Sequence, residues 1–465
     1  MPETHAAMVK AKVDKFTYMT TEKVPKLIME LSVPTIISML VTSFYNMADT
    51  YFVGKLDTQS TAAVGITFSV MAMIQAMGFF FGHGSGNYIS RHLGAKDYKA
   101  AEKMAATGFF SALIAGVLFA TIGLIFLRPL CIMLGSTPTI LPYTEQYMGI
   151  ILLGAPFMTA SLVLNNQMRF QGNAVYAMVG ITTGAILNII LAPILIFIFH
   201  MGVKGATIAT VISQICSFLL LLYMDSRGSN IKIRARNFTP RLSYLKEITG
   251  GGAPSLFRQG LGCTATALMN VAAGAYGDAA IAGMSIVGRV CFFISAVVIG
   301  FGQGFQPVCG FNYGAGLNSR VRKGFWFCVK GSFLFMLAVS IVGFICSEPI
   351  IEAFREGDPA VTSVGVSALR WQLVTFPLGA FIIMSNMMLQ TIRKSVRATI
   401  LASARQGLFF IPLIIILPQY MGLTGVEMCQ AGADLLSFLL ALPLTIPILK
   451  RLKSDRPQFS EKQPV

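Results

Sequence analysis

The feature that most constrains this chain is a succession of twelve apolar stretches, each of them long enough to cross a lipid bilayer. A helix needs about 20 consecutive apolar residues for one crossing, and Gly, Pro or clustered charges separate the stretches. The predicted helices cover residues 27–53, 60–87, 102–127, 141–165, 175–199, 203–224, 247–276, 280–310, 323–346, 360–388, 398–419 and 425–449. The sequence therefore predicts an all-α integral membrane protein with about twelve transmembrane helices.

Composition argues against a soluble enzyme and against a metalloenzyme. Charged residues make up 12% of the chain, whereas they make up about 25% of a typical soluble domain. The eight cysteines form no C-x-x-C pair, and the four histidines form no H-E-x-x-H motif. We therefore expect neither a metal site nor a cofactor.

Basic residues determine the predicted orientation. The chain has 36 Lys and Arg against 20 Asp and Glu, for a net charge of +16, which in a soluble chain would suggest a nucleic-acid partner. Here 28 of the 36 lie in segments on the same side as the N-terminus, four lie on the opposite side and four lie within helices. Because cytoplasmic loops are rich in Lys and Arg, we expect both termini in the cytoplasm, a location in the inner membrane and no nucleic-acid partner.

The two halves of the sequence resemble each other at a shift of 220 residues. Pro34 falls on Pro254, and Gly94-Ala95 falls on Gly314-Ala315. Each half has six predicted helices, an even number, so both halves enter the membrane from the same side and form a parallel repeat. Two such bundles meeting at a central cleft are typical of a transporter that works by rocking. The predicted units are a leader at 1–26, a six-helix bundle at 27–224, a basic cytoplasmic linker at 225–246, a second six-helix bundle at 247–449 and a cytoplasmic tail at 450–465.

Two features superficially resemble nucleotide-binding motifs. The Gly54-Lys55 pair is followed by Leu56 rather than by the Ser or Thr of a Walker A motif. The glycine runs at 82–86 and 300–304 lie at the ends of apolar helices without a preceding strand, so we interpret them as close helix contacts. ATP hydrolysis by this chain is not expected.

Asp49 is the most informative charge in the first half, because a charge inside the membrane costs at least about 2.5 kcal/mol on insertion scales. It lies near the outer end of the first predicted helix, with Asn46 one turn earlier. One interpretation is a carboxylate that only caps or packs. The other is a carboxyl group, made protonatable by desolvation, that loads a proton or binds a metal cation.

The second half has several polar residues within its predicted helices, which we interpret as candidate residues of a substrate cavity. Such residues face protein or water rather than lipid. Arg289 and Asp434 are expected at a similar depth, where they could form an ion pair. The candidates are Arg258, Gln259, Arg289, Arg405, Gln406 and Asp434.

At this point the chain resembles the multidrug and toxic compound extrusion (MATE) family over about residues 25 to 450. The resemblance rests on the repeat, on Asn46-Met47-Ala48-Asp49 leading to Gly54, and on the paired glycine-rich stretches that end at Gly94-Ala95 and Gly314-Ala315. The steps Phe257-Arg258-Gln259-Gly260 and Arg405-Gln406-Gly407 are similar to the MepA-like bacterial branch.

The resemblance implies an antiporter that expels small amphipathic, often cationic, organic compounds across the membrane while protons or sodium ions enter. The family's cation site corresponds to Asp49, Asn188, Ala192 and Thr210, and Ala192 replaces an Asp of the family pattern. With one carboxylate left, a proton is favoured over sodium as the coupling ion. The three arginines and single carboxylate considered in the second half do not match a cationic substrate.

The sequence leaves two other functions open. A flippase for lipid-linked oligosaccharides has a related architecture, and a strongly cationic cavity with a lateral opening would favour it. An integral-membrane enzyme would need clustered His, Asp or Glu at one membrane face, and the sequence has no such cluster. We therefore predict a transporter rather than an enzyme.

Overall fold

The structure is a computed structural model that describes residues 15–226, 231–354 and 357–455. Within these ranges every regular element is a helix, and eleven helices are long and apolar enough to cross a membrane. A further long helix, α9 (Leu242–Gly274), packs lengthwise against α3 (Thr58–Gly94) and is more polar. The predicted all-helical membrane fold is confirmed; α9 covers most of the predicted stretch 247–276 but is not one of the eleven.

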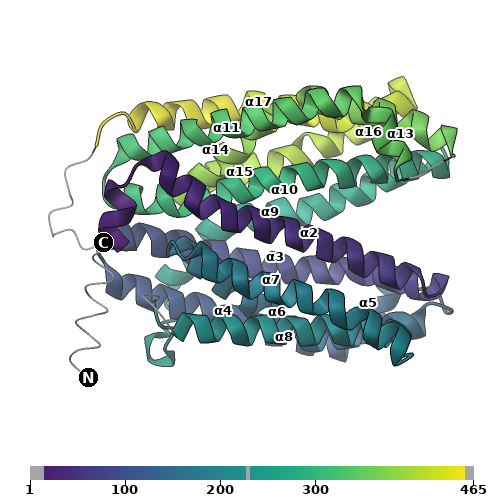
Figure 1. The fold of residues 1–465 in the computed structure, drawn as a ribbon, viewed down its shortest axis with the longest axis horizontal. Coiled ribbons are helices and arrows are strands. Elements are labelled where there is room, and N and C mark those ends of the chain that lie inside the picture. The colour runs from purple at the N-terminus through teal and green to yellow at the C-terminus, as the bar shows by residue number, and fades with distance from the viewer. Residues whose placement is uncertain (1–14, 227–230, 355–356, 456–465) are drawn as a thin grey trace.

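The two halves of the chain form the two halves of the molecule (Figure 1). The first half contains α2 (Val24–Gly54), α3, α4 (Tyr98–Ile125), α5 (Leu127–Met133), α6 (Leu141–Phe170), α7 (Ala174–Pro193), the π-helical turn η1 (Ile194–Ile198) and α8 (Gly202–Ser226). After the short 3-10 turn η2 (Ala235–Asn237), the second half contains α9, α10 (Asp278–Gly314), α11 (Asn318–Ile345), α12 (Ser347–Glu352), α13 (Pro359–Thr375), η3 (Phe376–Leu378), α14 (Gly379–Thr391), α15 (Ser395–Ser403), the π-helical turn η4 (Ala404–Leu408), α16 (Phe410–Met421) and α17 (Leu423–Arg451).

Helix ends follow local chemistry. The Asp57 side chain accepts a hydrogen bond from the Ser60 backbone N–H at 2.6 Å and so caps the start of α3. The same helix continues to Gly94, beyond the predicted end at residue 87. Arg91 stays inside the helix because its guanidinium donates to the Thr391 carbonyl at 2.8 Å and pairs with Glu247 at 3.2 Å.

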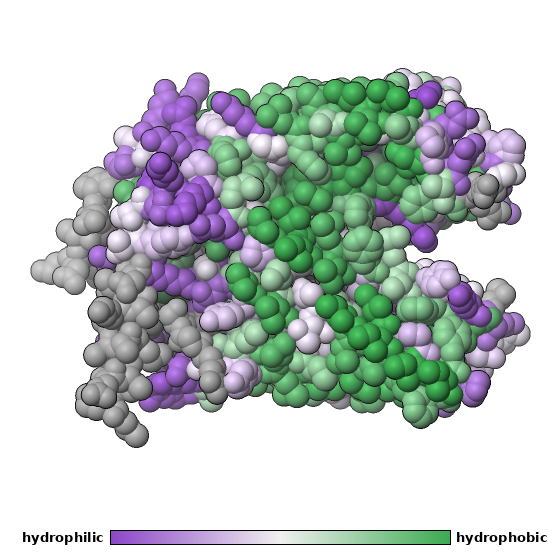
Figure 2. All heavy atoms as spheres, viewed as in Figure 1, coloured by the Kyte–Doolittle hydropathy of each residue, from purple (hydrophilic) through white to green (hydrophobic). Residues whose placement is uncertain are grey.

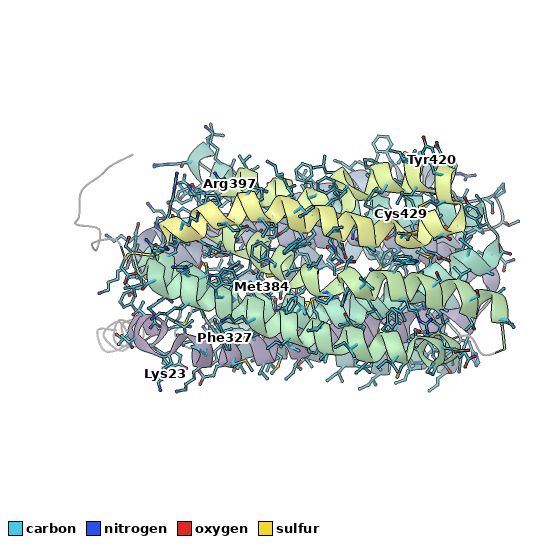
Figure 3. All side chains as sticks on the ribbon, turned by 90° about the horizontal axis from the view of Figure 1, so that it is seen from above. Lys23, Phe327, Met384, Arg397, Tyr420 and Cys429 are labelled. Carbon is cyan, nitrogen blue, oxygen red and sulfur yellow. The ribbon has the colours of Figure 1, made fainter. Side chains whose placement is uncertain are left out.

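The molecule has two unlike ends. We call the end that holds Val24 and Arg451 the closed end, and the end that holds Gly54 and Asp278 the open end. Figure 2 shows an apolar belt between two hydrophilic ends, and a notch that separates the two halves only at the open end. Figure 3 shows Lys23 near the closed end and Tyr420 near the open end. The protein therefore has a cleft that faces one side of the membrane.

Glycines bring the two halves into close contact at the closed end. A Cβ added to Gly94 would lie 2.1 Å from the Phe311 carbonyl oxygen, and one added to Gly314 would lie 1.9 Å from the Arg91 carbonyl oxygen. Positions 94 and 314 differ by the repeat shift, as do positions 91 and 311, so this pair of contacts follows the symmetry of the repeat. We call these contacts the glycine seam. The glycine runs at 82–86 and 300–304 also make close helix contacts, as their sequence suggested: a Cβ added to Gly84 would lie 2.3 Å from the Ile248 carbonyl oxygen, and one added to Gly300 would lie 2.7 Å from the Ile36 Cα.

Candidate functional site

Asp49 lies in a buried polar pocket inside the first half. Its side chain is 9% exposed, and its Oδ1 atom has no hydrogen-bond partner among the described residues. The side chains of Tyr45, one turn earlier on α2, and Tyr147, on α6, lie near enough to interact electrostatically with it. A charged carboxylate is costly in such a place unless something neutralises it. The pocket is therefore suited to hold a proton or a cation on Asp49.

Asn188 and Thr210 belong to the same pocket. The Asn188 side-chain amide on α7 donates to the Thr210 hydroxyl on α8 at 3.0 Å, and both side chains are buried. The hydroxyl of Tyr45 lies against Thr210 as well as near Asp49, so Tyr45 connects the two parts of the cluster. The residues predicted to couple a cation are Asp49, Asn46, Asn188 and Thr210, and α2, α7 and α8 bring three of them together: Asp49, Asn188 and Thr210.

Asn46 does not join them. Its side chain is exposed on α2, while Tyr45 beside it is buried. The prediction placed Asn46, three residues before Asp49, on the same helix face as Asp49. In the structure Tyr45, four residues before Asp49, faces the pocket instead. Ala192, which stands where the family pattern has an acid, is fully buried.

Sequence reasoning missed both tyrosines. Tyr45 had a signal, since it lies one turn before Asp49 in an apolar helix. Tyr147 comes from another helix, and nothing in its own neighbourhood marks it.

Asp434 in the second half is fully paired, but not with the predicted partner. The Arg405 Nε donates to Asp434 Oδ1 at 2.6 Å and its Nη2 to Oδ2 at 3.1 Å, and the Gln430 amide donates at 2.9 Å. The π-helical turn η4 contains Arg405 and packs against α17, whereas Arg289 is exposed. The expected pair of Arg289 and Asp434 is therefore wrong. The bidentate pair and the third hydrogen bond leave neither carboxylate oxygen of Asp434 without a partner.

A buried polar cluster joins the two halves near the closed end. Arg169, at the end of α6, is 2% exposed; it donates to Gln303 of α10 and lies 3.1 Å from the His83 ring. The other His83 ring nitrogen lies 2.8 Å from the Ser255 hydroxyl on α9, which also receives a hydrogen bond from Gln390 at 2.9 Å. Arg169 is one of the 28 basic residues that the sequence assigns to the side of the N-terminus. Its burial in a contact between distant helices could not be anticipated there.

The remaining candidates lie at the edge of this contact or apart from it. The Gln259 amide on α9 donates to the Gln75 side-chain carbonyl on α3 at 2.8 Å, across the two halves. Arg258 is partly exposed and its Nη1 lies 3.5 Å from the Asn386 side-chain oxygen on α14. Gln406 is partly buried in η4. Glu427, which sequence reasoning passed over, is buried and accepts a hydrogen bond from Ser367 at 2.5 Å.

Comparison with known proteins places these features in a family. A family model described as MatE matches residues 34–194 and 254–416, one segment in each half of the chain. The multidrug export protein MepA of Staphylococcus haemolyticus (strain JCSC1435) is 28% identical over 452 residues, which cover 97% of this chain and 99% of that protein.

Solved structures agree with the fold. A structure of MATE in complex with MaL6 has a TM-score of 0.88 and 27% identity, and it covers 94% of this chain and 99% of its own. An outward-facing multidrug resistance MATE family transporter of the MOP superfamily has a TM-score of 0.88 and 26% identity, covering 94% and 98%.

Proposed function

Since this chain belongs to the MatE family, as the two family-model matches show, we propose that it exports amphipathic drugs or other small organic compounds across the cytoplasmic membrane in exchange for protons. The family is one of transporters, so the chain is a multi-pass membrane protein and not an enzyme. Its similarity to multidrug exporters over nearly the whole length supports drug export over a lipid-linked oligosaccharide flippase. The single observation that carries the coupling role is the buried Asp49 carboxylate with an unpaired oxygen.

The position of Asp49 on α2 connects proton binding to rocking. The same helix contacts the second half, where the Ser32 hydroxyl donates to the Phe301 carbonyl at 3.1 Å and Ile36 packs on Gly300. Pro34, between these contacts, has no backbone N–H and weakens the helix at that point. Loading a proton on Asp49 changes the packing of α2 within its own bundle. Because α2 also contacts the other half, that change biases the equilibrium between the two orientations of the cleft.

The composition of the pocket favours a proton over sodium. Sodium, a hard cation, is held best by several oxygen ligands that include anionic ones. The pocket supplies one carboxylate at Asp49, and Ala192 contributes none. A proton needs only that carboxylate.

We therefore expect export to respond to protons and not to sodium. In proteoliposomes, norfloxacin efflux should follow an imposed pH gradient and should be unchanged by a sodium gradient at equal pH with the membrane potential clamped. Ala192→Asp should add sodium dependence, because it restores a second carboxylate, whereas the uncharged Ala192→Asn should not. Robust sodium-driven efflux by the unmodified protein would rule out proton-only coupling.

The proposed orientation has its own test. The excess of basic residues on one side predicts that the closed end lies in the cytoplasm. Both test positions are exposed. Arg234 precedes α9, which begins at the closed end, and Asp278 begins α10 at the open end. In intact cells, a cysteine at position 278 should react with a membrane-impermeant maleimide, and one at position 234 should react only after permeabilisation. The background should carry Cys263→Ser, since Cys263 is itself exposed. Labelling of position 234 in intact cells would reverse the orientation.

A further inference from the structure

Arg289 lies in the cleft at the point where α2 and α10 separate. The two helices touch through Ser32 and Gly304 near the closed end. Nearer the open end they touch through Phe44 and Phe293, whose rings are edge-to-face with their centroids 5.6 Å apart. Arg289 is one turn beyond Phe293 toward the open end and on the same side of α10. Its side chain is exposed. Phe293, Gly300 and Gly304 on this side of α10 all face α2, so Arg289 projects into the notch between the two halves that Figure 2 shows at the open end.

Arg258 has an equivalent place at the other contact between the halves. The contact of α3 with α9 runs from Gly84 and Ile248 to the hydrogen bond between Gln75 and Gln259. Arg258 adjoins this last hydrogen bond and is partly exposed. Just beyond it, a Cβ added to Gly260 would meet no atom within 4 Å, so the contact has ended. An arginine of the second half thus lies where each contact gives way to the cleft.

Neither arginine is neutralised. In the part of the chain that the structure describes, no carboxylate lies within ion-pair distance of Arg258 or Arg289. The buried carboxylates of the described residues lie elsewhere. Asp49 is in its own pocket, and the other three are hydrogen-bonded: Asp434 to Arg405, Glu427 to Ser367 and Asp225 to the Ile233 backbone N–H. Among the described residues, these two arginines therefore carry positive charge with no carboxylate paired to them.

The opposite wall is apolar and aromatic. On α2, Met47 and Tyr51 follow Phe44 at the spacing of one helix face, and both are exposed. The Lys55 ammonium lies 4.5 Å from the Tyr51 ring centre and adds a further cation at the mouth of the cleft. A guanidinium binds a carboxylate in a bidentate manner and does so more strongly where water is scarce. Such a chamber repels cations and suits an amphipathic molecule with one anionic group.

We propose that the cleft selects amphipathic compounds that carry an anionic group, such as a carboxylate, with Arg289 and Arg258 as the anion-binding residues and Phe44, Met47 and Tyr51 as the apolar wall. This proposal rests on the proposed export function and defines its substrate class. It departs from the cationic substrates that the family resemblance implies.

The test compares two dyes that differ in a single group. Rhodamine B carries a carboxylate that is ionised at neutral pH, and its ethyl ester is a permanent cation with the same ring system. Binding to the purified protein is measured by fluorescence anisotropy and export by efflux from proteoliposomes. We expect rhodamine B to bind about tenfold more tightly or better, a ratio that corresponds to about 1.4 kcal/mol. Arg289→Gln should remove most of that preference and Arg289→Lys should restore part of it.

Arg128→Gln is the matched control, because Arg128 is an exposed arginine of α5 that interacts with Glu145 outside the cleft. It should leave the preference unchanged. Equal binding of the two dyes, tighter binding of the ester, or a preference that survives Arg289→Gln together with Arg258→Gln would overturn the proposal. Displacement of rhodamine B by a much lower concentration of a polyprenyl diphosphate would also overturn it, in favour of a lipid-linked substrate. A binding preference without export would instead contradict the proposed export function and leave the charge selectivity standing.

Discussion

Replacing Asp49 with Asn is expected to abolish gradient-driven export while the protein still folds and inserts in the membrane. Asn has nearly the same size and shape as Asp, so the packing of the buried pocket is retained. It cannot ionise, and therefore it mimics a carboxyl group that never releases its proton. Norfloxacin efflux from proteoliposomes under a pH gradient should fall to the level of protein-free liposomes, while binding of norfloxacin to the purified variant should persist.

The matched control for this experiment is Asn46→Ala. Asn46 lies on the same helix within one turn but is exposed, so its removal should leave efflux close to that of the unmodified protein. If Asp49→Asn still concentrates norfloxacin under a pH gradient, Asp49 is only a packing residue. Glu427 would then be the next candidate, because Asp434 is occupied by Arg405 whereas Glu427 has a single hydroxyl partner at Ser367.

The contrast between Asp49 and Asp434 shows what sequence reasoning can predict about such a site. A carboxylate inside an apolar helix is visible from the sequence because its burial has a cost, and both residues were found in that way. What neutralises each of them depends on other helices. Arg405 pairs with Asp434 from within a π-helical turn, and no local pattern predicted that turn.

Burial of Arg169 is a second example. In the sequence a single arginine beside a polar turn is indistinguishable from the basic residues that mark cytoplasmic loops. In the structure it is surrounded by Gln303, His83 and Asn166, which come from three helices. The helices themselves could be predicted because each crossing of the bilayer needs a long apolar stretch. The polar contacts between helices could not, since each depends on which faces meet.

Substitutions in the glycine seam are the second change for which we expect a large loss of export. Gly94→Ala and Gly314→Ala are each expected to prevent the closed end from closing and to abolish export. The added Cβ would lie about 2 Å from the Phe311 or Arg91 carbonyl oxygen, and a backbone atom cannot turn aside as a side chain can. The halves must separate there, which shifts the population toward a cleft open at that end.

The measurement uses a buried reporter in the same contact. Ser90 is fully buried, and its hydroxyl lies against Gly310 of the other half. A thiol introduced as Ser90→Cys, in the Cys263→Ser background, should be protected in the unmodified protein and reactive in either alanine variant. Native Cys131 is buried in the first half and monitors general unfolding, because its protection should persist if only the seam opens.

Gly54→Ala and Gly65→Ala are the matched controls, since a Cβ at either position would meet no atom within 4 Å. Both should export normally and keep the Ser90→Cys thiol protected. The two seam variants should also resemble each other, because their contacts are related by the repeat. Normal export by Gly94→Ala with a protected thiol would mean that the working protein never closes through this seam. An effect of Gly94→Ala without one of Gly314→Ala would mean that the two contacts do not act as a symmetric pair.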